Sequence, residues 1–137
     1  AAGEVCLVVG WSGDIKQAQS RAAETHNGVE IGYAIPKEGA QMFFDNLAIP
    51  ADAKNVAEAH ELINYLYRPD VAAKNSDFLS YANGNLASQK LISPKIFNDK
   101  TIYPDEATMK RLFVITARDP ATQRTINRLW TRVKTGR

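Results

Sequence analysis

Gly10-Trp11-Ser12-Gly13-Asp14 is the stretch of sequence that decides the fold. It follows an apolar run at residues 5–9 and precedes a helical pattern over residues 15–25. A continuous apolar run bounded by glycine predicts a strand buried on both faces, as in the parallel sheets of α/β proteins. Trp11 and Asp14 would then lie in the crevice at the carboxyl end of a strand, where α/β sheets bind their ligands.

Trp11 and Asp14 together indicate a site for a small organic cation. The face of an indole ring and a carboxylate both favour positive charge. Each residue also has a simpler explanation, because Trp11 could anchor the core and Asp14 is a good N-cap for the helix that follows. When Asp14 is considered by itself, its position before the helix favours the capping role over ligand binding.

The same stretch nearly matches the G-x-S-x-G nucleophile elbow of serine hydrolases. Asp14 stands in place of the final glycine, which normally allows the helix to pack closely. His26 and His60 lie in polar helical stretches, with no evident pairing to Ser12. We therefore expect no catalysis and no cofactor.

The composition is that of an ordinary globular domain. The chain has 137 residues, of which 45% are hydrophobic and 23% charged, and a formal net charge of +2. This charge is too small to indicate nucleic-acid binding, and no apolar run approaches the length of a membrane span. The first residues lack the pattern of a signal peptide, so we expect any export signal to be absent here. Cys6 should pack inertly in the first strand, unless it pairs with a cysteine outside this chain.

A second aromatic residue and carboxylate follow further along the chain. Residues 29–35 alternate apolar with small or polar side chains and predict a second strand. Residues 41–46 are also β-prone, and side chains alternate across a strand. Phe43 and Asp45 should therefore share one face.

The remaining chain predicts helices and one polar loop. Asn55 and Glu58 form a capping-box-like start to a helix, and Pro69 suits the first turn of the next one. Tyr81 lies in the loop that follows, where ligand contacts often gather. We find no internal repeat, metal-ligand cluster or phosphate loop in the sequence.

The last helix is signalled at both ends. Asp119 is a good N-cap, Pro120 suits the first turn, and Gly136 lies just past the end. Its apolar residues recur at helical spacing, and the opposite face carries arginines four residues apart, which we interpret as a solvated face. The apolar residues are Ile126, Leu129, Trp130 and Val133, and the basic ones are Arg124, Arg128 and Arg132.

Several of these stretches resemble the periplasmic polyamine-binding proteins of bacterial ABC importers, with the putrescine and spermidine receptors of proteobacteria most similar. The resemblance covers essentially the whole chain. It is carried by Gly10-Trp11-Ser12-Gly13-Asp14, Gly32-Tyr33-Ala34-Ile35-Pro36-Lys37-Glu38-Gly39, Phe43-Phe44-Asp45-Asn46-Leu47-Ala48-Ile49-Pro50, Asp52-Ala53-Lys54-Asn55, Tyr81-Ala82-Asn83-Gly84-Asn85, Ile102-Tyr103-Pro104, Thr122-Gln123-Arg124 and Trp130-Thr131-Arg132-Val133-Lys134-Thr135-Gly136.

The resemblance implies an α/β fold, the C-terminal part of a two-lobed type II periplasmic binding protein. Family members run to well over twice this length. Residues 1–42 would end the second lobe, and residues 43–113 would return to the first lobe. Residues 114–137 would cross back, with the last helix packing on the second lobe.

Matching the family's motifs position by position implies five ligand-binding residues. They are Trp11, Asp14, Phe43, Asp45 and Tyr81. Relatives often carry tryptophan where this chain has Phe43, and phenylalanine offers a weaker cation–π face. A polyamine needs aromatic walls for its methylenes and carboxylates for its ammonium ends, because an unpaired buried ammonium is very costly.

The resulting hypothesis is a periplasmic solute-binding protein that captures putrescine or spermidine between two lobes and delivers it to an ABC permease. The alternative is a sensor of the same fold that presents ligand occupancy to a signalling partner. The chain would contain pieces of two sheets with open strand edges. We therefore expect it to need the missing N-terminal portion or a second copy of itself, but neither nucleic acid nor direct membrane insertion.

Overall fold

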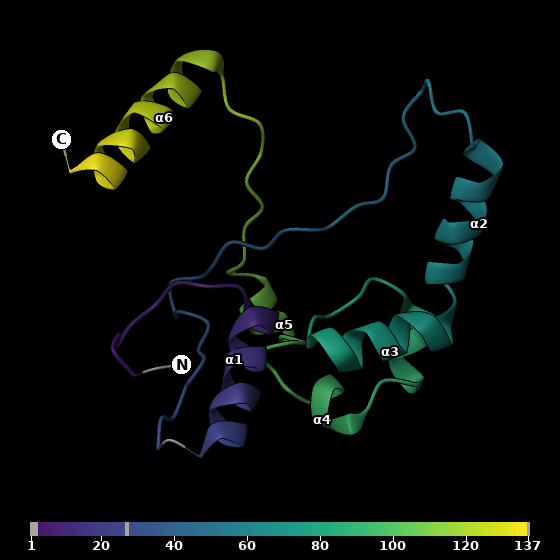
Figure 1. Ribbon diagram of the computed structural model, residues 1–137, viewed down its shortest axis with the longest axis horizontal. Coiled ribbons are helices and arrows are strands. Elements are labelled where there is room, and N and C mark those ends of the chain that lie inside the picture. The colour runs from purple at the N-terminus through teal and green to yellow at the C-terminus, as the bar shows by residue number, and fades with distance from the viewer. Residues whose placement is uncertain (1–2, 27, 137) are drawn as a thin grey trace.

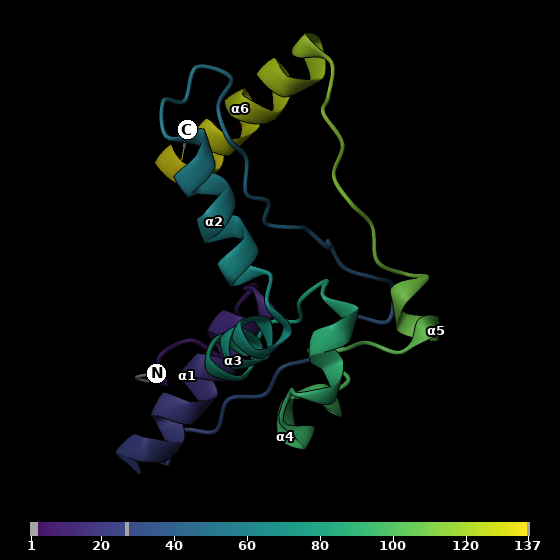
Figure 2. The ribbon, with the colours of Figure 1, turned by 90° about the vertical axis from the view of Figure 1, so that its right-hand side faces the viewer.

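The structure, a computed structural model, describes residues 3–26 and 28–136. Figure 1 shows helices joined by long irregular segments, with α1, α3 and α4 gathered together and α2 and α6 projecting away from them, and Figure 2 shows α5 to one side of this group. The helices, including the 3₁₀ helix η1, are α1 (Ser12–Thr25), α2 (Val56–Leu66), α3 (Pro69–Leu79), η1 (Leu86–Lys90), α4 (Pro94–Phe97), α5 (Glu106–Met109) and α6 (Pro120–Thr135).

The packed centre of the chain lies around α3, η1 and α4. Its buried apolar side chains are Ala73, Ile92, Ile96 and Ile102, against which Phe97 and Tyr103 pack. The rings of Phe97 and Tyr103 lie 5.1 Å apart between centroids. All of these residues come from within one stretch of the chain, so this centre needs only short loops to close.

The first predicted strand does not form. Residues 5–9 have no regular secondary structure, bend at Cys6 and are exposed, with Leu7 89% and Val9 101% exposed. Cys6 is a free, exposed thiol, so the prediction that it packs in a buried strand is wrong for this chain. A strand needs hydrogen-bonding partners alongside it and apolar cover on its faces. In the part of the chain described here, nothing supplies either to this run.

Residues 29–35 have no regular secondary structure, so the predicted second strand does not form either. The side chains of Val29, Ile31, Tyr33 and Ile35 are half-buried and those between them are exposed, as expected for the period-two pattern. On one side the segment lies near α1, where the Gln19 side chain donates to the Ile31 carbonyl at 2.6 Å. The pattern therefore predicts correctly which side chains are partly covered, whereas the predicted strand needs neighbouring strands.

One parallel bridge, Gln41 with Phe113, is the sole β pairing that the described residues contain. The Met42 N–H donates to the Phe113 carbonyl at 2.8 Å, and the Phe113 N–H donates to the Ala40 carbonyl at 3.1 Å. Gly39 precedes the bridge with φ +115°, and a Cβ there would collide with the Arg111 carbonyl oxygen. Only glycine allows the two backbones to approach this closely.

The structure confirms both end signals of the last helix, α6. The Asp119 carboxylate accepts from the N–H groups of Ala121 and Thr122 at 2.9 and 3.0 Å, and Gly136 ends α6 in the left-handed conformation. In Figures 1 and 2, α6 stands apart from the helices at the centre. Its apolar side chains are accordingly open to solvent, with Trp130 59% and Val133 72% exposed.

The structure confirms only part of what the sequence predicts for the first residues of α2 and α3. Asn55 is the N-cap of α2, but its side chain makes no capping hydrogen bond, so the capping box does not form. Pro69 begins α3 as predicted. No helix among the described residues is both long and apolar enough to cross a membrane.

Candidate functional site

Five residues from three separate segments form the candidate site. Trp11 and Asp14 lie at the start of α1, Phe43 and Asp45 lie in the extended segment after Gly39, and Tyr81 follows α3. The three segments are far apart in sequence. Whether their side chains share a surface is therefore decided by the path of the chain.

The start of α1 places Trp11 just outside the helix and Asp14 inside its first turn. Trp11 occupies the N-cap position in an extended conformation, and its carbonyl accepts from the Ile15 N–H at 3.1 Å. The prediction that Asp14 caps the helix is therefore wrong, because Ser12 and Gly13 already have helical geometry. A carboxylate in the first turn still gains from the helix dipole.

The nucleophile-elbow interpretation gains no support from this geometry. Ser12 is the first residue of α1, and His26 ends the same helix. His26 therefore lies fourteen positions after Ser12, or about 21 Å away at the usual rise per residue. His60 lies on α2, which projects away from the centre (Figure 1).

Trp11 and Phe43 meet directly. Their ring centroids lie 4.4 Å apart, with the planes tilted by 59°. Such tilted pairs are favourable beyond the apolar area that they bury. Trp11 is 44% and Phe43 39% exposed, so the pair presents an open aromatic surface.

Tyr81 packs on the same end of α1. Gly13 is buried, and a Cβ on it would overlap the Tyr81 ring. The chain turns toward α1 at Ser80, which ends α3 in the left-handed conformation with φ +58°. The ring of Tyr81 therefore rests on the helix backbone at a position where only glycine leaves room.

The two carboxylates act on the Tyr81 hydroxyl. Burial raises the pKa of the Tyr81 phenol most; interaction with the Asp14 backbone lowers it, and the Asp14 and Asp45 carboxylates raise it further. The net pKa lies above the ordinary value, so the phenol stays neutral at physiological pH. Asp14 and Asp45 themselves remain exposed.

The structure thus brings all five predicted residues together. Trp11 contacts Phe43, Tyr81 contacts Gly13 beside Asp14, and the charge of Asp45 reaches Tyr81. We call the surface that these five side chains form the wall; it offers both aromatic rings and carboxylates. A linear cation fits such a wall, because its methylenes need apolar faces and its ends need acceptors.

An ion pair next to this wall was not foreseen from the sequence. The Lys16 ammonium lies 2.7 Å from the Asp99 carboxylate, and their side chains are only 19% and 27% exposed. The hydroxyl and N–H of Thr101 also donate to Asp99 at 2.6 and 2.9 Å. Lys16 follows Gly13 by one helical turn, so the pair fixes α1 against the segment before Tyr103. No local pattern couples two charges so far apart in sequence.

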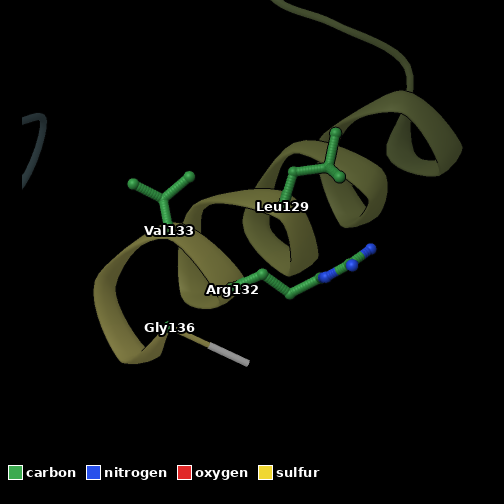
Figure 3. Close-up of a pocket in the computed structure, with 4 residues that line it drawn as sticks. All are labelled: Leu129, Arg132, Val133 and Gly136. Carbon is green, nitrogen blue, oxygen red and sulfur yellow. The ribbon is translucent and has the colours of Figure 1, made fainter.

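A hollow on α6 lies away from these five residues. It measures about 380 Å³ and is lined by Leu129, Arg132, Val133 and Gly136. Figure 3 shows that all four belong to α6 and its C-terminal end, so the hollow is one side of a single helix. Among the residues that the structure describes, no group of three or more His, Cys, Asp or Glu side chains could hold a metal ion.

Comparison with protein families matches residues 1–104 to a family described as bacterial extracellular solute-binding protein. Among characterised proteins, the putrescine-binding periplasmic protein PotF of Escherichia coli K12 is 47% identical over all 137 residues of this chain. The spermidine/putrescine-binding periplasmic protein of the same organism is 45% identical over 108 residues, or 79% of this chain. The chain spans 37% and 29% of the lengths of these two relatives.

Solved structures agree with these matches. A structure from Listeria monocytogenes, provisionally described as a spermidine/putrescine ABC transporter, superposes with a TM-score of 0.75 at 32% identity, covering 90% of this chain and 37% of its own. The spermidine/putrescine ABC transporter substrate-binding protein PotD of Streptococcus pneumoniae has a TM-score of 0.54 at 30% identity, covering 63% of this chain and 27% of its own.

Proposed function

Because the chain belongs to the family of bacterial extracellular solute-binding proteins, we propose that it forms part of a receptor that captures a polyamine, putrescine or spermidine, for an ABC importer. The predicted fold class is confirmed at the level of the family: the chain is part of the periplasmic-binding-protein fold. The described residues contain one β bridge and no strand, so the sheets of that fold need backbone partners that these residues do not supply.

The observation that supports this function is the convergence of two carboxylates and three rings. Trp11, Phe43 and Tyr81 offer apolar faces to methylene groups, and Asp14 and Asp45 offer acceptors to ammonium groups. Two charges at about 4 Å attract each other by roughly 4 kcal/mol at the effective dielectric of a protein surface. Each carboxylate is therefore worth a large part of the affinity for a dication.

We further propose that the ligand lies between two lobes. Residues 1–42 would end the second lobe, 43–113 would belong to the first, and 114–137 would cross back. The open side of the wall and the exposed apolar residues at 5–9 and on α6 would then be covered by the portion of the protein that precedes this chain, or by a second copy of the chain. Closure of the lobes would remove water from the amine contacts and produce a shape that a permease can bind.

The proposal places the protein in the periplasm and gives it no catalytic step. Delivery to the permease would need only the change in shape on ligand binding. No observation favours the sensor alternative. A deletion strain separates the two hypotheses, because loss of a transport receptor abolishes growth on polyamines whereas loss of a sensor leaves uptake intact.

Calorimetric titration of Asp45→Ala in the full-length protein tests the site. Removing one partner of a buried charge pair costs about 3–5 kcal/mol, so we expect putrescine affinity to fall at least about a hundredfold. Asp52→Ala is the matched control, because Asp52 is an exposed aspartate of the same segment and lies outside the wall. Equal affinity of Asp45→Ala and the parent protein would exclude the proposed site.

Ligand choice is a separate measurement on the same protein. Titration with putrescine, cadaverine, spermidine and spermine compares amines that differ in length and charge. With phenylalanine at position 43, the cation–π contribution is smaller than with tryptophan. We therefore expect Phe43→Trp to strengthen binding of every amine whose ammonium lies over this ring.

A further inference from the structure

The loop that carries Tyr81 is fixed by the side chain of Asn83. Its amide nitrogen donates to the Ser76 hydroxyl at 2.8 Å and to the Ala72 carbonyl at 3.3 Å. Its amide oxygen accepts from the Asn85 N–H at 2.8 Å and from the Ser88 hydroxyl at 2.9 Å. Both donors and both acceptor positions of the carboxamide are therefore used.

The partners of Asn83 belong to the packed centre. Ser76 on α3 is 3% exposed and Ser88 on η1 is fully buried. The Asn83 backbone N–H also donates to the Tyr103 hydroxyl at 3.3 Å, next to the apolar core. Buried polar networks of this kind hold one geometry firmly, because each group left unpaired is costly.

Tyr81 lies between two fixed points of the backbone. On one side, the Ser80 N–H donates to the Ser76 carbonyl at 2.9 Å and ends α3. On the other side, Asn83 ties the chain back to the same helix. With the loop fixed at both ends, the direction of the Tyr81 ring toward Gly13 is set by the backbone.

We propose that Asn83 is a positioning residue for ligand binding: it holds Tyr81 against Gly13 of α1 without touching the ligand. This inference rests on the proposed function. A bound amine then meets a ring that is already in place, which avoids the entropy of ordering it at the moment of binding. Nothing in the local sequence distinguishes this role, since asparagine is common in loops.

A double-mutant cycle in the full-length protein tests the proposal. Asn83→Ala should raise the Kd for putrescine by about tenfold or more. In a Tyr81→Ala background, the same substitution should cause no further loss, because its effect acts through the ring. An equal loss in both backgrounds, or no loss in the parent background, would overturn the proposal.

Three further measurements keep the outcome clear. Asn75→Ala changes an exposed asparagine on α3 and should leave affinity unchanged. If Asn83→Ala does not fold, Ser76→Ala removes only one partner of the network and should give a smaller loss with the same dependence on Tyr81. Spectroscopic titration of the Tyr81 phenol in Asn83→Ala protein that denaturant unfolding shows to be folded should show its pKa returning toward the ordinary value; a raised pKa kept in the folded variant would contradict the positioning role.

The cycle also separates this proposal from the proposed function. If Tyr81→Ala alone leaves affinity unchanged, the ligand site is wrong and Asn83 has no ring to position. If Tyr81→Ala weakens binding and Asn83→Ala does not, the site stands and the positioning role is wrong.

Discussion

Helices α3 and α6 both begin with proline, yet they have opposite surroundings. Helix α6 has a side-chain cap at Asp119 and a left-handed Gly136 at its end, but buries none of its described residues. Helix α3 has no side-chain hydrogen bond at its N-cap, but buries Ala72, Ala73 and Ser76. Local signals therefore decide where a helix forms, and neighbours in space decide what it buries.

The same contrast applies to the extended segments. Residues 5–9 form the most apolar run of the sequence analysis and are exposed here, whereas the core is built from scattered isoleucines at 92, 96 and 102. Those isoleucines have partners within the same stretch of chain. The apolar run, in a parallel sheet, would need strands that are distant in sequence.

Truncating one apolar side chain in the packed centre and one on α6 should give the largest difference in unfolding free energy. Ile96→Ala removes a side chain that is 8% exposed and should cost about 2–5 kcal/mol of unfolding free energy. Leu129→Ala on α6, at 49% exposure, should cost less than about 0.5 kcal/mol in this chain. Denaturant unfolding measures both, and equal costs would remove the distinction. In the full-length protein, the cost at Leu129 should rise if α6 is covered there.

Gly13→Ala should have the next largest effect, which should appear in the affinity for putrescine. The added methyl group would overlap the Tyr81 ring, so the ring must leave its place on α1. Alanine favours the helix by about 1 kcal/mol over glycine, so stability should hold while putrescine affinity falls about tenfold or more. Gly84→Ala is the control, since a Cβ there meets nothing within 4 Å. Unchanged affinity for Gly13→Ala would show that the Tyr81 contact does not matter for the ligand.

Breaking the ion pair between Lys16 and Asp99 should have a smaller effect. Burial raises the pKa of Asp99, but hydrogen bonds from Lys16 and Thr101 outweigh it and leave the pKa below its ordinary value. A lowered pKa means that the pair stabilises the fold above the unfolded value near 4 and that this stabilisation is lost as pH falls through the folded value.

Asp99→Asn removes this pH dependence and should cost roughly 1–3 kcal/mol near neutral pH, the usual range for hydrogen bonds to a charged group. Unfolding by denaturant at neutral and acidic pH measures both effects. Asp52→Asn is the control, because Asp52 is exposed and makes no ion pair among those found in the described chain. A parallel pH dependence in the parent protein and in Asp99→Asn would contradict the assignment.

Loss of the α6 cap should have the smallest effect. Hydrogen bonds from Thr122 and Ala121 hold the pKa of Asp119 below its ordinary value. Asp119→Ala should therefore fray the first turn of α6, and acid should do the same in the parent protein as the carboxylate becomes protonated. Amide exchange at Ala121 and Thr122 measures this, while exchange in α3 should stay unchanged. Faster exchange in α3 as well would indicate that α6 is coupled to the packed centre.

The sequence alone determined the helices with strong end signals, the alternating burial of residues 29–35, and the chemistry of the five site residues. These features depend on contacts within a few residues, which local patterns encode. The tertiary structure decided that Trp11 meets Phe43, that Tyr81 rests on Gly13, that Asn83 anchors the Tyr81 loop, and that residues 5–9 lie exposed. Each of these depends on which distant segments the chain path brings together, and a strand or an apolar face acquires its environment only from such neighbours.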